Sequence, residues 1–200
     1  MKKQLAMLML AIVAMACGND SVDPVTNPET EAVRVGVDDQ IGVLYNNLGF
    51  SLSISDINAS REWSIDWDAD GADDLIVNYS YDAQTERQLF TLTGAGIIDI
   101  ARTEETFDFL SPGLAGSRLV GQGDELDPDE NWTNGEPLFL VSTQRNTAVG
   151  TISNSFNNDL FLPIRQAGVP GWLSFEIRAA PNGLQVQQII LKQTGLQEIN

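Results

Sequence analysis

The stretch from Asp66 to Ile76 carries the residues whose types and spacing can do identifiable chemistry. It reads D-W-D-A-D-G-A-D-D-L-I, so carboxylates alternate along the chain, a glycine follows, and another carboxylate comes three residues later. This is the spacing of a calcium loop, because hard Ca²⁺ takes several oxygen ligands at once and a tight turn lets one short segment supply them. Counted as an EF-hand-type loop, position 1 is Asp66, the next carboxylates fall at positions 3 and 5, and position 6 is Gly71.

The second half of the loop departs from a helical EF-hand. Position 7 would be the backbone carbonyl of Ala72 and position 9 is Asp74, but position 12 is Val77 rather than a bidentate glutamate. The loop resembles the DxDxDG calcium loops of integrin-type and dockerin-type proteins. The strand-flanked integrin version fits better, because the residues directly after the loop are predicted to begin a strand rather than a helix. This resemblance implies that Asp73 points away and that the metal is held by Asp66, Asp68, Asp70, the Ala72 carbonyl and Asp74.

A metal-free turn is the alternative to a calcium site, because Asp and Gly also dominate ordinary turns. Carboxylates this close repel each other strongly without a cation, so the spacing favours a bound metal. An all-oxygen ligand set argues against zinc or copper, and Mg²⁺ prefers to keep several of its waters. We therefore predict Ca²⁺ as the cofactor of this loop.

Little else in the chain has the residue types of a catalytic site. The chain has no histidine, which excludes Ser-His-Asp and Cys-His catalysis and most zinc enzymes. A pair of carboxylates can hydrolyse glycosides, but among 28 acidic residues no pair stands out. A second acidic stretch, Asp124 to Glu130, lacks the alternating spacing and the glycine of the first and is typical of a solvated loop, with a contribution to a metal site as the alternative.

Tryptophans are the other candidate ligand contacts, because indole rings stack on sugar rings when they are exposed. Trp67 lies inside the calcium loop between two predicted ligands, so we expect it to project outward. Trp132 follows the second acidic stretch. For both residues the alternative is packing in or beside the core, where large aromatic side chains are usually found.

The N-terminus has the pattern of an export signal. Lys2 and Lys3 precede an apolar run, residues 5–13, that is too short to span a bilayer permanently. Residues 14–17 then read A-M-A-C and resemble the lipobox of bacterial lipoproteins, with Ala14 where that family usually has leucine. The resemblance implies that Cys17 becomes the acylated first residue of the mature protein and anchors it in the outer membrane, on the periplasmic face or at the cell surface.

The net charge of the chain limits which partners it can bind. Its formal net charge is −17, and such a surface repels nucleic acid and anionic lipid headgroups, so neither is expected to bind the folded body. The membrane is an expected partner only through the lipid on Cys17. Since this is the only cysteine, no internal disulfide can form. A glycan or protein ligand stays open.

The elements that must position the loop are strands. Residues 33–37, 50–54, 75–81, 89–92, 138–141, 160–162, 172–177 and 186–191 alternate or run apolar between Gly, Asn, Asp and Pro, which predicts short strands. The only helix predicted is a short one around residues 106–110. We predict an all-β fold, an antiparallel, jelly-roll-like β-sandwich over residues 32–200, preceded by a signal peptide over 1–16 and a lipidated, flexible linker over 17–31.

Most of residues 35–195 also resembles a group of secreted, uncharacterised β-rich proteins common in Bacteroidota. The shared features are a single D-x-D-x-D-G-x-x-D motif after an early strand pair, and a Gly-Trp near the C-terminus, here Gly171-Trp172, followed by a strand. The resemblance implies a β-sandwich with structural calcium and brings no activity with it. The sequence therefore predicts a non-enzymatic, calcium-stabilised lipoprotein. The alternatives are a calcium-dependent carbohydrate-binding or adhesion module and a carboxylate-dependent glycosidase.

Overall fold

The computed structural model describes residues 32–200 apart from 108–112, 145–146, 150–155, 181–184 and 199–200. The predicted signal peptide, Cys17 and the linker lie outside these residues. The part of the chain that is described contains strands and no helix, which confirms the all-β prediction. The strands are β1 (Val43–Ser53), β2 (Arg61–Ile65), β3 (Leu75–Asp82), β4 (Arg87–Gly94), β5 (Ile98–Phe107), β6 (Leu114–Ser117), β7 (Trp132–Thr133), β8 (Leu138–Gln144), β9 (Thr147–Val149), β10 (Asp159–Gln166), β11 (Val169–Ala179) and β12 (Val186–Gln197).

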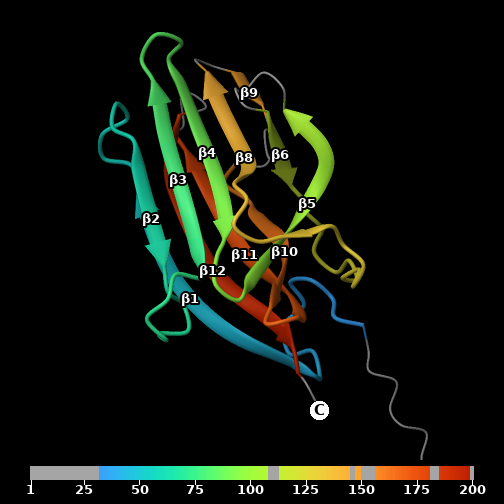
Figure 1. The fold of residues 1–200 in the computed structure, drawn as a ribbon. Coiled ribbons are helices and arrows are strands. Elements are labelled where there is room, and N and C mark those ends of the chain that lie inside the picture. The colour runs from blue at the N-terminus through green and yellow to red at the C-terminus, as the bar shows by residue number, and fades with distance from the viewer. Residues whose placement is uncertain (1–31, 108–112, 145–146, 150–155, 181–184, 199–200) are drawn as a thin grey trace, which may run out of the picture. The chain divides into compact units, whose positions relative to one another are not determined.

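The strands follow one continuous hydrogen-bonded path in the order β1-β12-β11-β10-β5-β6-β8-β4-β3-β2, with β7 on β5 and β9 on β8. All pairs are antiparallel except the single parallel bridge between β6 and β8, so the sheet is mixed. The sheet curls until β10, β11 and β12 lie behind β3, β4 and β8, and β5 and β6 carry the path from one half to the other (Figure 1). Instead of two separately bonded sheets, one curled sheet encloses the core.

Alternation along the strands explains which side chains fill that core. Successive residues of a strand point to opposite faces, so one set goes inward from each half of the sheet. Leu75, Val77 and Tyr79 of β3 meet Phe175 and Ile177 of β11 in a single buried cluster. This arrangement lets each half cover the apolar face of the other.

The segment predicted to be helical is a strand where it is described. Thr106 and Phe107 are the last residues of β5 and pair with Ala115 and Leu114 of β6, so the helix prediction is wrong there. Threonine and phenylalanine suit a pleated surface better than a helix, and β6 supplies main-chain hydrogen-bond partners. The rest of the predicted helix, residues 108–110, lies outside the described residues. No helix of the described residues is long and apolar enough to cross a membrane.

A second, smaller apolar cluster lies on the outer face of β10 and β11. Phe161 and Trp172 point there, because their neighbours Leu162 and Leu173 point into the main core. Residues 33–35 cross this face together with residues 123–126, and the two segments are joined by hydrogen bonds such as Val35 N to the Asp124 carbonyl at 2.9 Å. We call this pair of segments the outer strap.

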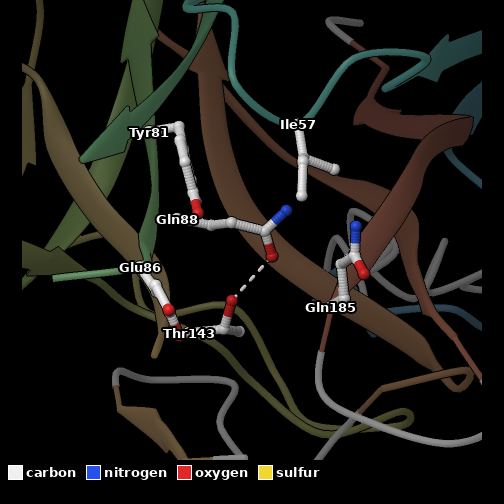
Figure 2. A pocket seen from close by; sticks show the side chains of 6 residues that line it. All are labelled: Ile57, Tyr81, Glu86, Gln88, Thr143 and Gln185. Atoms are coloured by element: carbon white, nitrogen blue, oxygen red, sulfur yellow. Dashed lines mark hydrogen bonds between the residues drawn. The ribbon is translucent and has the colours of Figure 1, made fainter. Parts of the chain in front are cut away.

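A buried polar network ties β4 to β12, which lie on opposite halves of the curled sheet. The Oε1 atom of Gln88 accepts hydrogen bonds from Thr143 Oγ1 at 2.7 Å and from Val186 N at 3.1 Å. Its Nε2 atom donates to the Val186 carbonyl and to Tyr79 Oη, each at 3.3 Å. Figure 2 shows this amide beside a cavity of about 160 Å³, with Thr143 bonded to it. Because its polar atoms are satisfied by neighbouring protein groups, we interpret this network as structural.

Candidate metal centre

The acidic motif forms the loop of a β-hairpin. Strand β2 ends at Ile65, β3 begins at Leu75, and these two residues face each other in the antiparallel pair. The N–H of Asp74 donates to the Ile65 carbonyl at 2.8 Å, which closes the loop over residues 66–74. A strand therefore follows the motif directly, as its sequence predicts.

Two residues turn the chain within this loop through left-handed backbone conformations. Ala69 has a φ of 62° and Gly71 a φ of 92°. Glycine adopts this region without a Cβ penalty, which explains the glycine of the motif. For Ala69 the conformation is strained and must be offset by the contacts around it.

The aspartate side chains accept hydrogen bonds from the main chain of the turn. Asp66 accepts from the Gly71 N–H at 2.9 Å and from the Asp70 N–H at 3.2 Å, and Asp68 shares the Asp70 N–H at 3.2 Å. The Asp70 carboxylate accepts from the Ala72 N–H at 2.8 Å. These bonds hold the side chains of Asp66 and Asp68 toward the middle of the loop.

Three carboxylates meet at that point. Asp66, Asp68 and Asp74 each place one oxygen so that all three oxygens lie within 4.8 Å of one another, an arrangement that can hold a metal ion. We call these residues the carboxylate group. Asp68 is exposed and Asp66 half-buried, but Asp74 is only 2% exposed. The group therefore spans from solvent to the edge of the core.

Burial makes the charge on Asp74 costly. It raises the pKa of this carboxyl above its usual value of 3.8, against the lowering effect of a hydrogen bond from the Trp67 N–H at 2.9 Å. The charges of Asp68 and Asp70 raise the pKa further. A cation among the three oxygens would reverse this repulsion, and hard cations favour such an all-oxygen set, so the residues fit a metal.

The predicted ligands divide into two sets. The structure brings together Asp66, Asp68 and Asp74, and places Asp70 outside the group, exposed and bonded to the turn through its own carboxylate. Ala72 is exposed in the same turn, with its N–H directed to Asp70. Sequence reasoning missed the Trp67 N–H as a partner of Asp74, because a main-chain donor leaves no trace in residue types.

The side chains of Trp67 and Trp132 pack against other residues and are not fully exposed. Trp67 is half-buried and packs against the main core, so it does not project freely outward from the loop as predicted. Trp132 is also half-buried. Its Nε1 donates to the Pro128 carbonyl at 3.3 Å, and the guanidinium carbon of Arg165 lies 5.3 Å from its ring centroid. Within the described residues, no tryptophan is among the exposed large apolar side chains.

The second acidic stretch serves local structure. Asp124 accepts from the Gly121 N–H at 2.7 Å, and Glu125 forms an ion pair with Arg34 at 2.6 Å. Glu130 is paired with Arg118 at 2.7 Å. None of these acids belongs to the metal-competent group found among the described residues.

The fold and the site together define the class of the protein: an all-β domain with the carboxylate group in one hairpin loop. The chain has no significant match among protein-family models, curated protein sequences or solved structures. Function is therefore inferred from the chemistry of the loop and of its surroundings.

Proposed function

We propose that the protein is a calcium-stabilised, non-enzymatic lipoprotein of the cell envelope, anchored to the outer membrane through acylated Cys17. The meeting of Asp66, Asp68 and buried Asp74 within 4.8 Å in a hairpin loop carries the calcium part of this proposal. The signal peptide, the lipid anchor and the likeness to Bacteroidota β-rich proteins are proposed from the N-terminal pattern and the motifs. In this reading the facing halves of the curled sheet correspond to the layers of a jelly-roll-like sandwich.

The position of the loop indicates what the calcium would do. Strand β2 ends the hydrogen-bonded path, so among the described strands it pairs with β3 alone. A cation that joins Asp66 and Asp68, just after β2, to Asp74, just before β3, would fasten the loop end of this hairpin. Calcium would thus hold an edge strand in register, because it binds the folded loop and not the unfolded chain.

The alternatives find less support at the loop. A sugar site built from calcium and neighbouring aromatic rings needs an exposed ring, and Trp67 packs against the core instead. A glycosidase needs two carboxylates facing each other across a cleft, whereas the three grouped carboxylates converge on one point. Convergence suits a metal better than a sugar ring between an acid and a nucleophile.

Titration of the full chain with calcium, after bound metal has been removed with a chelator, tests the proposal. At a concentration one hundred times Kd, a ligand that binds only the folded state adds about 2.7 kcal/mol, which raises Tm by about 5–10 °C for a domain of this size. We expect calcium to give such a shift and magnesium to give a smaller one at equal concentration. No shift with calcium would refute the proposed role.

A matched pair of variants separates a site from general charge screening. Asp68 and Asp73 are both exposed acids of the same loop, and only Asp68 belongs to the carboxylate group. Asp68→Asn should remove most of the calcium shift, and Asp73→Asn should leave it intact. Equal effects of the two substitutions would mean that calcium only neutralises an acidic surface.

A further inference from the structure

Strand β12 breaks register with both of its neighbours at the same point. Against β11, Gln193 pairs with Ser174 and Leu191 pairs with Phe175, so Lys192 is an extra residue. Against β1 the pairing also shifts on passing from Gln193 to Leu191. Lys192 therefore lies in a β-bulge that affects three adjacent strands.

The bulge changes where side chains point. In a regular strand two consecutive side chains go to opposite faces, but Lys192 and Gln193 both line one cavity on the outer face. Bulges of this kind re-aim side chains and are over-represented beside functional sites. Lys192 is also the only lysine of the chain after residue 3. The bulge thus delivers two neighbouring polar groups to the same place.

The cavity has a volume of about 230 Å³ and lies over β1, β12, β11 and β10, which are adjacent in Figure 1. One wall comes from Gly36, Asp38 and Gln122, which lie next to the outer strap. Phe161 and Trp172 close its base, but they are packed in the smaller apolar cluster and only 8% and 1% exposed, so they present little ring surface. Hydrogen-bonding side chains line the cavity: Asp38, Asn47, Gln122, Asp159, Lys192 and Gln193.

Charges in and around the cavity select against anions. The Lys192 ammonium is bonded to Asp159 and lies 3.1 Å from Glu176, so its positive charge is already matched. Arg178 in turn holds Glu176 at 2.7 Å. Asp38 forms no ion pair within the described part of the chain and adds a free acceptor. A neutral ligand rich in hydroxyl groups can use the carboxylates as acceptors and the amides as both donors and acceptors.

We propose that this cavity binds one pyranose ring of a neutral glycan. Side-chain carboxylates and amides supply the acceptors and donors that sugar hydroxyls need, and they converge on this cavity. Its volume is below the range of about 300–1,000 Å³ for drug-sized ligands, so a single ring fits better than a long ligand. The site needs no calcium and is independent of the carboxylate group.

Titration of the isotope-labelled full chain with glucose, galactose, mannose and N-acetylglucosamine, followed by NMR, tests the proposal. At millimolar sugar we expect at least one of the four to shift the indole N–H signal of Trp172 and the side-chain amide signals of Asn47 and Gln193. The indole signal of Trp67 should stay in place. The same shifts should occur after calcium is chelated, so failure of one site is distinguishable from failure of the other.

Two neighbouring acids provide the control. Asp38 lines the cavity and Asp39, equally exposed, does not. Asp38→Asn should weaken sugar binding about tenfold, because a charge-assisted hydrogen bond is lost, and Asp39→Asn should leave it unchanged. Asn tolerates the left-handed backbone of position 39, whose φ is 59°. Equal losses in both variants, shifts that vanish on chelation, or no shift with any of the four sugars would overturn the proposal.

Discussion

Replacing Gln88 with leucine tests whether a buried amide holds the two halves of the curled sheet together. Gln88 is 4% exposed and bonds Val186 through both its N–H and its carbonyl. Leucine has a similar size but no polar atoms. The substitution therefore leaves both main-chain groups of Val186, a residue with no exposed surface, without this partner.

The expected loss in the free energy of unfolding follows from these contacts. An orphaned buried donor or acceptor costs about 1–3 kcal/mol, and Val186 has two such groups. Tyr79 Oη loses less, since it still donates to the Ile57 carbonyl at 2.6 Å. Burying an apolar side chain in place of the amide returns about 1.5 kcal/mol. We therefore expect Gln88→Leu to lower the free energy of unfolding by about 2–3 kcal/mol.

Urea denaturation measures this loss through a lower midpoint at an unchanged m-value. Thr143→Val is the matched control: it removes one of the bonds to Gln88 Oε1 and leaves the one from Val186 N, so it should cost only about 1 kcal/mol. A loss for Gln88→Leu no larger than the control's would refute the reasoning. It would show that β4 and β12 are held together by apolar packing alone.

Three further predictions concern charge, packing and metal. Glu176→Gln should lower stability at neutral pH and have progressively less effect below pH 4.5, the usual pKa of this carboxyl, when stability is followed by urea denaturation across pH. Gly195→Ala should cost about 1–3 kcal/mol in the same assay, because the new Cβ would lie 2.5 Å from the buried indole of Trp172. Asp68→Asn, but not Asp73→Asn, should remove the calcium-dependent rise in Tm measured by calorimetry.

The charge and packing predictions each have an outcome that would contradict them. A hydrogen bond from Arg178 holds the pKa of Glu176 below its usual value, and Lys192 adds to this, so the stabilisation is present above pH 4.5 and disappears as pH falls through the lower folded-state pKa. A variant difference that grows on acidification would contradict that sign. For Gly195→Ala the control is Gly121→Ala, whose Cβ would have the side chain of Asp124 as its nearest neighbour, at 3.0 Å. Equal losses would remove the packing explanation.

Local patterns were sufficient for several of the strands and for the hairpin loop, but they did not predict β2 or β5, and the strand expected over residues 33–37 is only an isolated bridge at Arg34. The alternation of Leu75, Val77 and Tyr79 predicts a strand with one buried face, and that strand is β3. The spacing of the aspartates predicts a turn of fixed shape, because side chains a few residues apart can bond the main chain of the same turn. The helix predicted near residue 106 failed because pairing with β6 supplied what local preference did not show.

Contacts between distant parts of the chain decided which residues of the loop are buried. Which of the loop aspartates is buried depends on how the hairpin lies on the core: Asp74 is 2% exposed and Asp68 is exposed, although both are the same residue type. Trp67 turned inward for the same reason, since apolar surface beneath the loop was available to it. No property of the loop sequence encodes that surface.

The sequence by itself determined the residue types, the period of the strands and the spacing of the carboxylates, all of which act over a few residues. Only the tertiary structure decided that one curled sheet would form, that Gln88 would reach Val186 across it, and that a bulge would turn Lys192 and Gln193 into one cavity. The physical reason is that burial, strand register and the meeting of side chains from β1, β10, β11 and β12 depend on pairings between distant parts of the chain.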